Sequence, residues 1–147
     1  MNQLELILLI DDSDADNHYH NIVISRAKIG STVKSINSSI DALDYLRKAI
    51  SQDNDLVFPL PQLVLMDINM PALNGFELLD KLRQVPDPKG RKKDMKIFML
   101  SGSLNPDDKA MAVEKYADLV YGFYVKPLTE NVIIEIRNKH FPTKDVT

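Results

Sequence analysis

The sequence predicts an α/β fold in which a parallel sheet is covered by helices on both faces. Apolar runs of strand length alternate with segments of helical period, in the order strand–helix repeated five times. The runs LELILLI, LVLM and IFML are almost continuously hydrophobic, which is typical of strands buried on both sides. The length of 147 residues suits one domain with a single core.

The first strand is expected at residues 4–10, where the apolar run is densest. Ser13 has the residue type and position of a helix N-cap, and Gly30 has those of a helix end. Between them, helical periodicity places one set of side chains on the inner face: Ala15, Tyr19, Ile22, Val23 and Ala27.

The next strand–helix unit is shorter and weaker in its signals. Residues 32–37 include the β-branched Thr32, Val33 and Ile36 and predict the second strand, and Ser38 or Ser39 then caps a helix. The buried stripe of that helix is Leu43, Leu46 and Ile50. The segment SQDNDLVFPLP contains two prolines and is expected to be a loop.

LVLMD at residues 63–67 predicts the third strand, followed by a helix over residues 73–84. Phe76, Leu79 and Leu82 recur at helical spacing and are expected to face inward. The polar segment VPDPKGRKKD then connects to the fourth strand at residues 96–100, and its basic cluster is expected to be solvated loop.

Asn105 followed by Pro106 has the signature of an N-cap with proline at the first helical position, and this helix is expected to reach about Ala117. The fifth strand is expected at residues 121–125. The last helix is expected at residues 128–139, with His140 as a helix-end cation. Its inner face is Val132, Ile133 and Ile136.

Composition narrows the function classes. The net charge of -3 and a pI near 5.6 argue against a general nucleic-acid binder, which normally carries a basic patch. The absence of cysteine excludes disulfides and thiolate metal sites. The N-terminus lacks a basic region and a cleavage site, and its apolar run is too short to span a membrane. We therefore expect a cytoplasmic domain with no direct contact to nucleic acid or membrane.

Polar residues follow four of the predicted strands. Open α/β sheets bind ligands outside the carboxyl ends of their strands. Each such residue alone is most simply a turn former or a surface side chain, but their joint placement at one sheet edge indicates a site. These residues are Asp11 and Asp12, Asp67, Ser101 and Gly102, and Lys126 with Pro127.

The residue types at this edge suit phosphoryl chemistry. Crowded carboxylates oppose each other's ionisation, and Mg²⁺ relieves that cost because it prefers carboxylate oxygens. One of Asp11 and Asp12 should bind the ion directly and the other through water. Asp67 ends a rigid strand, so its carboxylate can act as a nucleophile. Lys126, the Ser101 hydroxyl and the Gly102 backbone N–H would then clamp the phosphoryl oxygens.

At these residues the sequence resembles the receiver domains of response regulators in two-component signalling. The segments LLIDD, LVLMDINMPALNGFELL, MLSG and FYVKP match the motifs of that family in order, and the similarity covers nearly the whole chain. The resemblance implies a flavodoxin-like, doubly wound sheet of five parallel strands in the order 2-1-3-4-5. It also implies one receiver domain over residues 1–147.

The resemblance assigns roles to the same residues. Asp67 would be the phosphoacceptor, and Mg²⁺ (or Mn²⁺) would be held by Asp11, Asp12, Asp67 and the backbone carbonyl of Asn69. Ser101 and Lys126 would contact the phosphoryl group, and the bond before Pro127 would be cis. Ser101 and Phe123 would form the switch; because Phe123 has no hydroxyl group, that switch would work by packing alone.

The expected function is therefore signalling and not enzymatic turnover beyond self-phosphorylation and self-dephosphorylation. A histidine kinase or phosphotransfer protein would donate the phosphoryl group, and an unknown protein would read the fourth helix, fifth strand and fifth helix. Tyr116, Tyr121 and Tyr124 belong either to that face or to the core. The chain ends seven residues after His140, so we expect no output domain; a fragment of a longer protein is the alternative.

Two other function classes compete with this interpretation. An aspartate-nucleophile phosphohydrolase would need a second acid two residues after its nucleophile, and Asn69 stands there instead. Such an enzyme would also need an insertion that shapes a substrate pocket. A pseudo-receiver scaffold that binds without phosphate is disfavoured because every acidic position is present.

Overall fold

The computed structural model describes residues 4–51 and 57–142 and confirms the predicted sheet. All neighbouring strands are parallel, in the order β2-β1-β3-β4-β5. The strands are β1 (Leu6–Ile10), β2 (Thr32–Ile36), β3 (Leu63–Asp67), β4 (Lys96–Ser101) and β5 (Val120–Val125).

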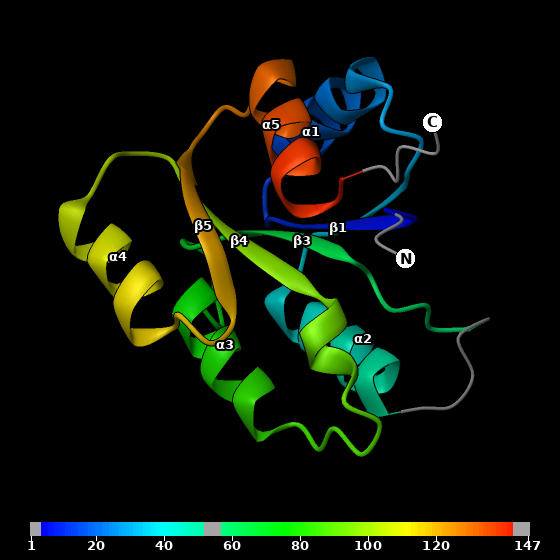
Figure 1. The fold of residues 1–147 in the computed structure, drawn as a ribbon. Helices are drawn as coiled ribbons and strands as arrows, with labels where there is room; N and C mark the ends of the chain where they lie inside the picture. Colours follow the sequence, from blue (N-terminus) through cyan, green and yellow to red (C-terminus); the bar gives the residue numbers. More distant parts are fainter. Residues whose placement is uncertain (1–3, 52–56, 143–147) are drawn as a thin grey trace.

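The helices cover both faces of this sheet. Figure 1 shows α1 (Asp14–Ala27) and α5 (Glu130–His140) together on one side. The other side carries α2 (Ser39–Ser51), α3 (Gly75–Gln84) and α4 (Pro106–Ala110), and α4 continues into a π-helical turn, η2 (Met111–Lys115). A 3₁₀ turn, η1 (Arg91–Asp94), precedes β4.

Each face of the sheet has its own hydrophobic core. Successive side chains of a strand point to opposite faces. Leu8 and Ile10 therefore pack with α2 and α3, whereas Ile7 and Leu9 pack with α1 and α5. All five residues of β1 and of β3 are buried. This two-sided burial explains why the strand sequences are continuously apolar.

The predicted inner face of α1 is right for Val23 and Ala27, which pack on the core, but wrong for other positions. Tyr19 and Ile22 are 46% and 38% exposed, while the polar residues Asn17 and His20 are buried beside Val23 and Ile24. Hydrophobic periodicity cannot detect this arrangement, because both polar side chains face inward to make hydrogen bonds. The helix also ends before Gly30, at Ala27, where Lys28 adopts a left-handed conformation with φ 54°.

Capping moves other helix boundaries by a few residues. Asn74 accepts a hydrogen bond from the Glu77 backbone, and Glu77 reciprocates, so α3 begins at Gly75 rather than at residue 73. Thr129 caps α5, which therefore begins at Glu130 rather than at residue 128. The N-cap at Asn105 with Pro106 is confirmed, although the helix it opens ends at Lys115.

His140 differs from the helix-end cation that its position indicated. Its ring packs edge-to-face on Phe98 with centroids 5.0 Å apart, and the Lys96 ammonium donates a hydrogen bond to its carbonyl oxygen. Burial, together with the positive charges of Lys96 and Lys139, lowers the pKa of His140. The residue therefore favours the neutral form and acts as an aromatic core contact.

The predicted loop over residues 51–61 lies partly outside the described residues. Its described end is tied to α2, because the Tyr45 hydroxyl donates to the carbonyl oxygen of Pro59. None of the helices in the described part of the chain is both long enough and apolar enough to cross a bilayer.

Gly75 packs so closely behind the end of β3 that a side chain should not fit. A Cβ atom there would lie 2.6 Å from Met99 Cε, 2.8 Å from the Asp67 carbonyl oxygen and 3.0 Å from Ile68 Cα. Since two of these atoms are backbone, we expect Gly75→Ala to lower the free energy of unfolding by about 2 kcal/mol in urea denaturation. Gly102→Ala, which meets nothing within 4 Å, should change it by less than about 0.5 kcal/mol. Equal stability of the two variants would contradict this packing.

Candidate functional site

The parallel sheet brings the predicted site residues to one edge. Asp11 follows β1, Asp67 ends β3 and Ser101 ends β4. The Lys126 backbone N–H donates to the Ser101 carbonyl oxygen at 2.8 Å, which extends the pairing of β4 and β5 by one residue. Lys126 is therefore held beside the end of β4, and its side chain can reach the ends of β1 and β3.

Three carboxylates meet at this edge. Asp11 and Asp67 are each only 3% exposed, whereas Asp12 is exposed. One carboxylate oxygen from each residue lies within 4.8 Å of the others. The Asp11 Oδ1 atom also accepts the Ser13 backbone N–H at 3.0 Å, which fixes its orientation. This is the oxygen-rich, negatively charged donor set that a hard divalent cation prefers.

The Lys126 ammonium lies among the same acids. Its Nζ atom is 2.7 Å from Asp11 Oδ2, 3.0 Å from Asp16 Oδ2 and 3.2 Å from Asp67 Oδ1. Burial opposes its charge, but hydrogen bonds to Asp11 and Asp16 and the charge of Asp67 outweigh burial and raise the pKa of Lys126. One ammonium cannot neutralise the whole acidic group, so the site retains negative charge.

The environment of Asp67 raises the pKa of its carboxyl group. Burial, and then the negative charge of Asp11, raise its pKa from 3.8 to about 6, against smaller opposing effects of Lys126 and the Asn69 backbone N–H. Among the described residues, Asp67 Oδ1 has no well-directed hydrogen bond although it is buried. A buried carboxylate oxygen without a well-directed hydrogen bond, next to two further carboxylates, fits a divalent cation at this position.

Ser101 and Gly102 lie at the adjacent strand end, but the Ser101 hydroxyl is turned toward its own loop. The hydroxyl donates to the Ser103 carbonyl oxygen at 2.7 Å and accepts the Ser103 backbone N–H at 3.3 Å. Ser101 is 1% exposed, while Gly102 is exposed. The hydroxyl must therefore rotate before it can contact a group on Asp67.

The remaining predicted residues occupy the surroundings of the acidic group. The Lys126–Pro127 peptide bond is cis. Asn69 is exposed in the loop after β3. Phe123 is partly buried on β5 and packs on the core formed with α2 and α3.

The three tyrosines divide between core and surface. Tyr116 is buried and stacks on Phe76, with its hydroxyl donating to Asp80. Tyr121 is 44% exposed, and Tyr124 lies between these extremes. Of the three, Tyr121 alone is an exposed surface residue.

Sequence reasoning missed the contribution of α1 to this site. Asp16 contacts Lys126, the Asn17 amide donates to the Asp11 carbonyl oxygen at 2.8 Å, and His20 Nε2 accepts the Leu128 backbone N–H at 3.3 Å. Burial and the nearby Lys126 lower the pKa of His20, which keeps it neutral as an acceptor requires. The spacing of Asp16 and His20, four residues apart, was the available signal that both share one helix face.

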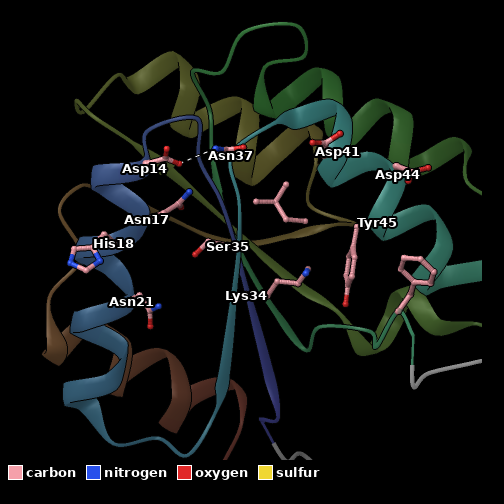
Figure 2. A pocket seen from close by; sticks show the side chains of 12 residues that line it. Asp14, Asn17, His18, Asn21, Lys34, Ser35, Asn37, Asp41, Asp44 and Tyr45 are labelled. Atoms are coloured by element: carbon pink, nitrogen blue, oxygen red, sulfur yellow. Dashed lines mark hydrogen bonds between the residues drawn. The ribbon is translucent and has the colours of Figure 1, made fainter.

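A hollow of about 650 Å³ lies beside this edge, between α1, β2 and α2. Figure 2 shows His18 and Asn21 of α1 on one side of it and Asp44 and Tyr45 of α2 on the other. Three of its charged groups have partners: Asp14 accepts a hydrogen bond from Asn37, Asp44 pairs with Lys48, and the Lys34 ammonium lies over the Tyr45 ring. The hollow holds none of the Asp11, Asp12 and Asp67 carboxylates.

Comparison with known proteins agrees with this geometry. The family described as response regulator receiver domain matches residues 7–138. Response regulator Rcp1 of Synechocystis is 28% identical over 117 residues, which are 80% of this chain and 75% of that protein. A crystal structure of a two-component response regulator from Cytophaga hutchinsonii is 30% identical with a TM-score of 0.80, covering 96% of this chain and 99% of that one.

The raised pKa of Asp67 predicts that stability depends on pH. Between pH 3.8 and about 6, Asp67 holds a proton in the folded state that it releases in the unfolded state. The free energy of unfolding of the metal-free protein therefore falls as the pH rises through this range, and the loss is complete above about pH 6. We expect Asp67→Asn to raise the free energy of unfolding by about 2 kcal/mol near neutral pH, with a smaller gain toward pH 4. Urea denaturation in the presence of a metal chelator measures the free energy of unfolding at both pH values.

Glu114→Gln serves as the control for this comparison, because Glu114 is an exposed acid on η2. It should show no pH-dependent gain. If the Asp67 variant gained nothing near neutral pH, or gained equally at all pH values, the destabilising environment of Asp67 would be disproved.

Proposed function

This chain belongs to the response regulator receiver domain family, and from that premise we propose that it accepts a phosphoryl group on Asp67 in a Mg²⁺-dependent reaction. The supporting observation is the setting of Asp67: a buried carboxylate oxygen without a well-directed hydrogen bond among the described residues, beside Asp11, Asp12 and Lys126. A receiver domain is a signalling domain and not a classical enzyme. The family implies a histidine kinase or phosphotransfer protein as its partner.

The residues that would hold the metal ion are Asp11, Asp12 and Asp67, with the backbone carbonyl of Asn69 as a further ligand. Bound there, Mg²⁺ or Mn²⁺ supplies positive charge against the phosphoryl oxygens. Asp12 is exposed and Asp11 is buried, so the two adjacent carboxylates differ in their access to solvent. This difference agrees with one of them binding the metal ion directly and the other through a water molecule. The acidic group itself attracts the cation, because a single lysine leaves it negatively charged.

In the transfer step, an Asp67 carboxylate oxygen attacks the phosphorus of a phosphohistidine on the partner. A phosphorus–oxygen bond forms, the phosphorus–nitrogen bond breaks, and the electron pair of the broken bond returns to the histidine ring. The Lys126 ammonium and the Gly102 backbone N–H stabilise the phosphoryl oxygens. The Ser101 hydroxyl joins them after leaving its hydrogen bonds with Ser103.

Release of the Ser101 hydroxyl provides the link from chemistry to signal. Its movement changes the loop between β4 and α4, and Phe123 can then move inward by packing alone. The face read by a downstream protein would be formed by α4, β5 and α5, where Tyr121 is exposed. This is a local change in charge and packing that shifts the equilibrium between two arrangements of one surface.

Phosphorylation is tested with acetyl phosphate as a small-molecule donor. With Mg²⁺, intact-mass spectrometry should show a single phosphoryl adduct on the wild-type chain, and chelation should abolish it because the acidic group then repels the donor. Asp67→Asn should show no adduct, whereas Glu114→Gln should be labelled normally. Full labelling of Asp67→Asn would contradict the assignment of Asp67 as the phosphoacceptor.

Metal binding is tested separately by thermal unfolding. Mg²⁺ at about 100 times its dissociation constant should stabilise the wild-type chain by about 2.7 kcal/mol, since it binds only the folded state. Asp12→Asn should lose most of this gain without unfolding the protein, because Asp12 is exposed. Asp14→Asn is the matched control: it removes the same charge two residues away, outside the three-carboxylate group, and should keep the gain. If Mg²⁺ did not change the unfolding temperature of the wild-type chain, the proposed metal site would be contradicted.

A further inference from the structure

We propose that Asp16 is a positioning residue that competes with Asp67 for the Lys126 ammonium in the unphosphorylated site and so opposes phosphorylation. The inference rests on the proposed function, in which Asp67 is the phosphoacceptor. Asp16 belongs to the first turn of α1 and is not among the acids that the sequence motifs single out.

The directions of the Lys126 contacts support this role. Nζ makes directed hydrogen bonds to Asp11 Oδ2 at 2.7 Å and to Asp16 Oδ2 at 3.0 Å. Asp67 Oδ1 lies 3.2 Å from the same nitrogen but receives no directed hydrogen bond from the described residues. The ammonium has three N–H donors, and in this state its well-directed hydrogen bonds go to Asp11 and Asp16, whereas its contact with Asp67 is an ion pair without such a bond.

α1 holds the loop of Lys126 at a second, independent point. His20 lies one turn after Asp16 on the same helix face, and its Nε2 atom accepts the Leu128 backbone N–H. Asp16 therefore restrains the lysine side chain, while His20 restrains the backbone two residues further on. For this reason, loss of the Asp16 carboxylate should remove one competitor for the ammonium without releasing the loop.

Asp16 also differs from Asp11 in what it can do once a cation is present. Asp11 belongs to the group of three carboxylates that would share a metal ion, and among the described residues Asp16 is outside that group. A metal ion would weaken the hold of Asp11 on Lys126, but Asp16 would still compete for the ammonium. Phosphorylation replaces the single charge of Asp67 with a more negative group, so the charge of Asp16 also opposes it.

The test compares Asp16→Asn with wild type in the full chain, with beryllofluoride as the phosphoryl mimic and saturating Mg²⁺. Titration calorimetry should show Asp16→Asn binding beryllofluoride about threefold to tenfold tighter, a range that allows for the 44% exposure of the Asp16 side chain. Asp14→Asn removes the same charge from the same helical turn without contacting Lys126, and should change the affinity by less than about twofold. Asp16→Glu, which keeps the carboxylate, should bind closer to wild type than Asp16→Asn does.

The outcomes separate the two proposals. If wild type binds beryllofluoride and Asp16→Asn binds equally or more weakly, the role of Asp16 is overturned and the phosphoacceptor stands. If wild type binds no beryllofluoride with Mg²⁺, the proposed function fails and Asp16 loses its role with it. A purely structural Asp16 would lower the unfolding temperature of Asp16→Asn and leave its affinity equal to that of Asp14→Asn, which also overturns the inference.

Discussion

The contact of the Lys126 ammonium with Asp11, Asp16 and Asp67 is the interaction on which the site depends. It joins the end of β5 to β1, β3 and α1. A buried carboxylate without a compensating charge is costly, and both Asp11 and Asp67 are almost fully buried. Lys126 makes this arrangement tolerable, but a single positive charge leaves negative charge behind. This remaining negative charge is the basis on which we propose a cation site beside Asp67.

The architecture explains how so polar an edge is maintained on an apolar sheet. β1 and β3 are buried on both faces, so the backbones that carry Asp11 and Asp67 are held by two cores at once. The loop after β3 is fixed from α2, where the buried Ser39 hydroxyl donates to the Pro71 carbonyl oxygen and accepts the Leu73 backbone N–H. Because these backbones are rigid, a change of charge at this sheet edge is expected to move side chains, such as the Ser101 hydroxyl, while the fold stays the same.

Most of the fold and the acidic group could be predicted from the sequence because their signals are local. β3 has the predicted bounds, and Asp11, Asp12 and Asp67 follow strands that share one edge. The α1 contacts could not be predicted by hydrophobic pattern, because Asn17 and His20 are buried through hydrogen bonds to residues distant in sequence or to backbone. The partner of Asp16 likewise depends on a tertiary contact, because Lys126 is 110 residues away in the sequence. The strand order in the sheet was expected from the family resemblance, and the observed strand pairing confirms that order.

The most direct test of this account is an NMR titration of the Asp67 side-chain carboxyl carbon without and with Mg²⁺. A desolvated carboxylate that needs a cation should titrate with a pKa of about 6 in the absence of metal, and its pKa should fall well below that value when Mg²⁺ is bound. A pKa near the ordinary 3.8 that Mg²⁺ leaves unchanged would contradict the account, because Asp67 would then be neither crowded nor in contact with a metal site.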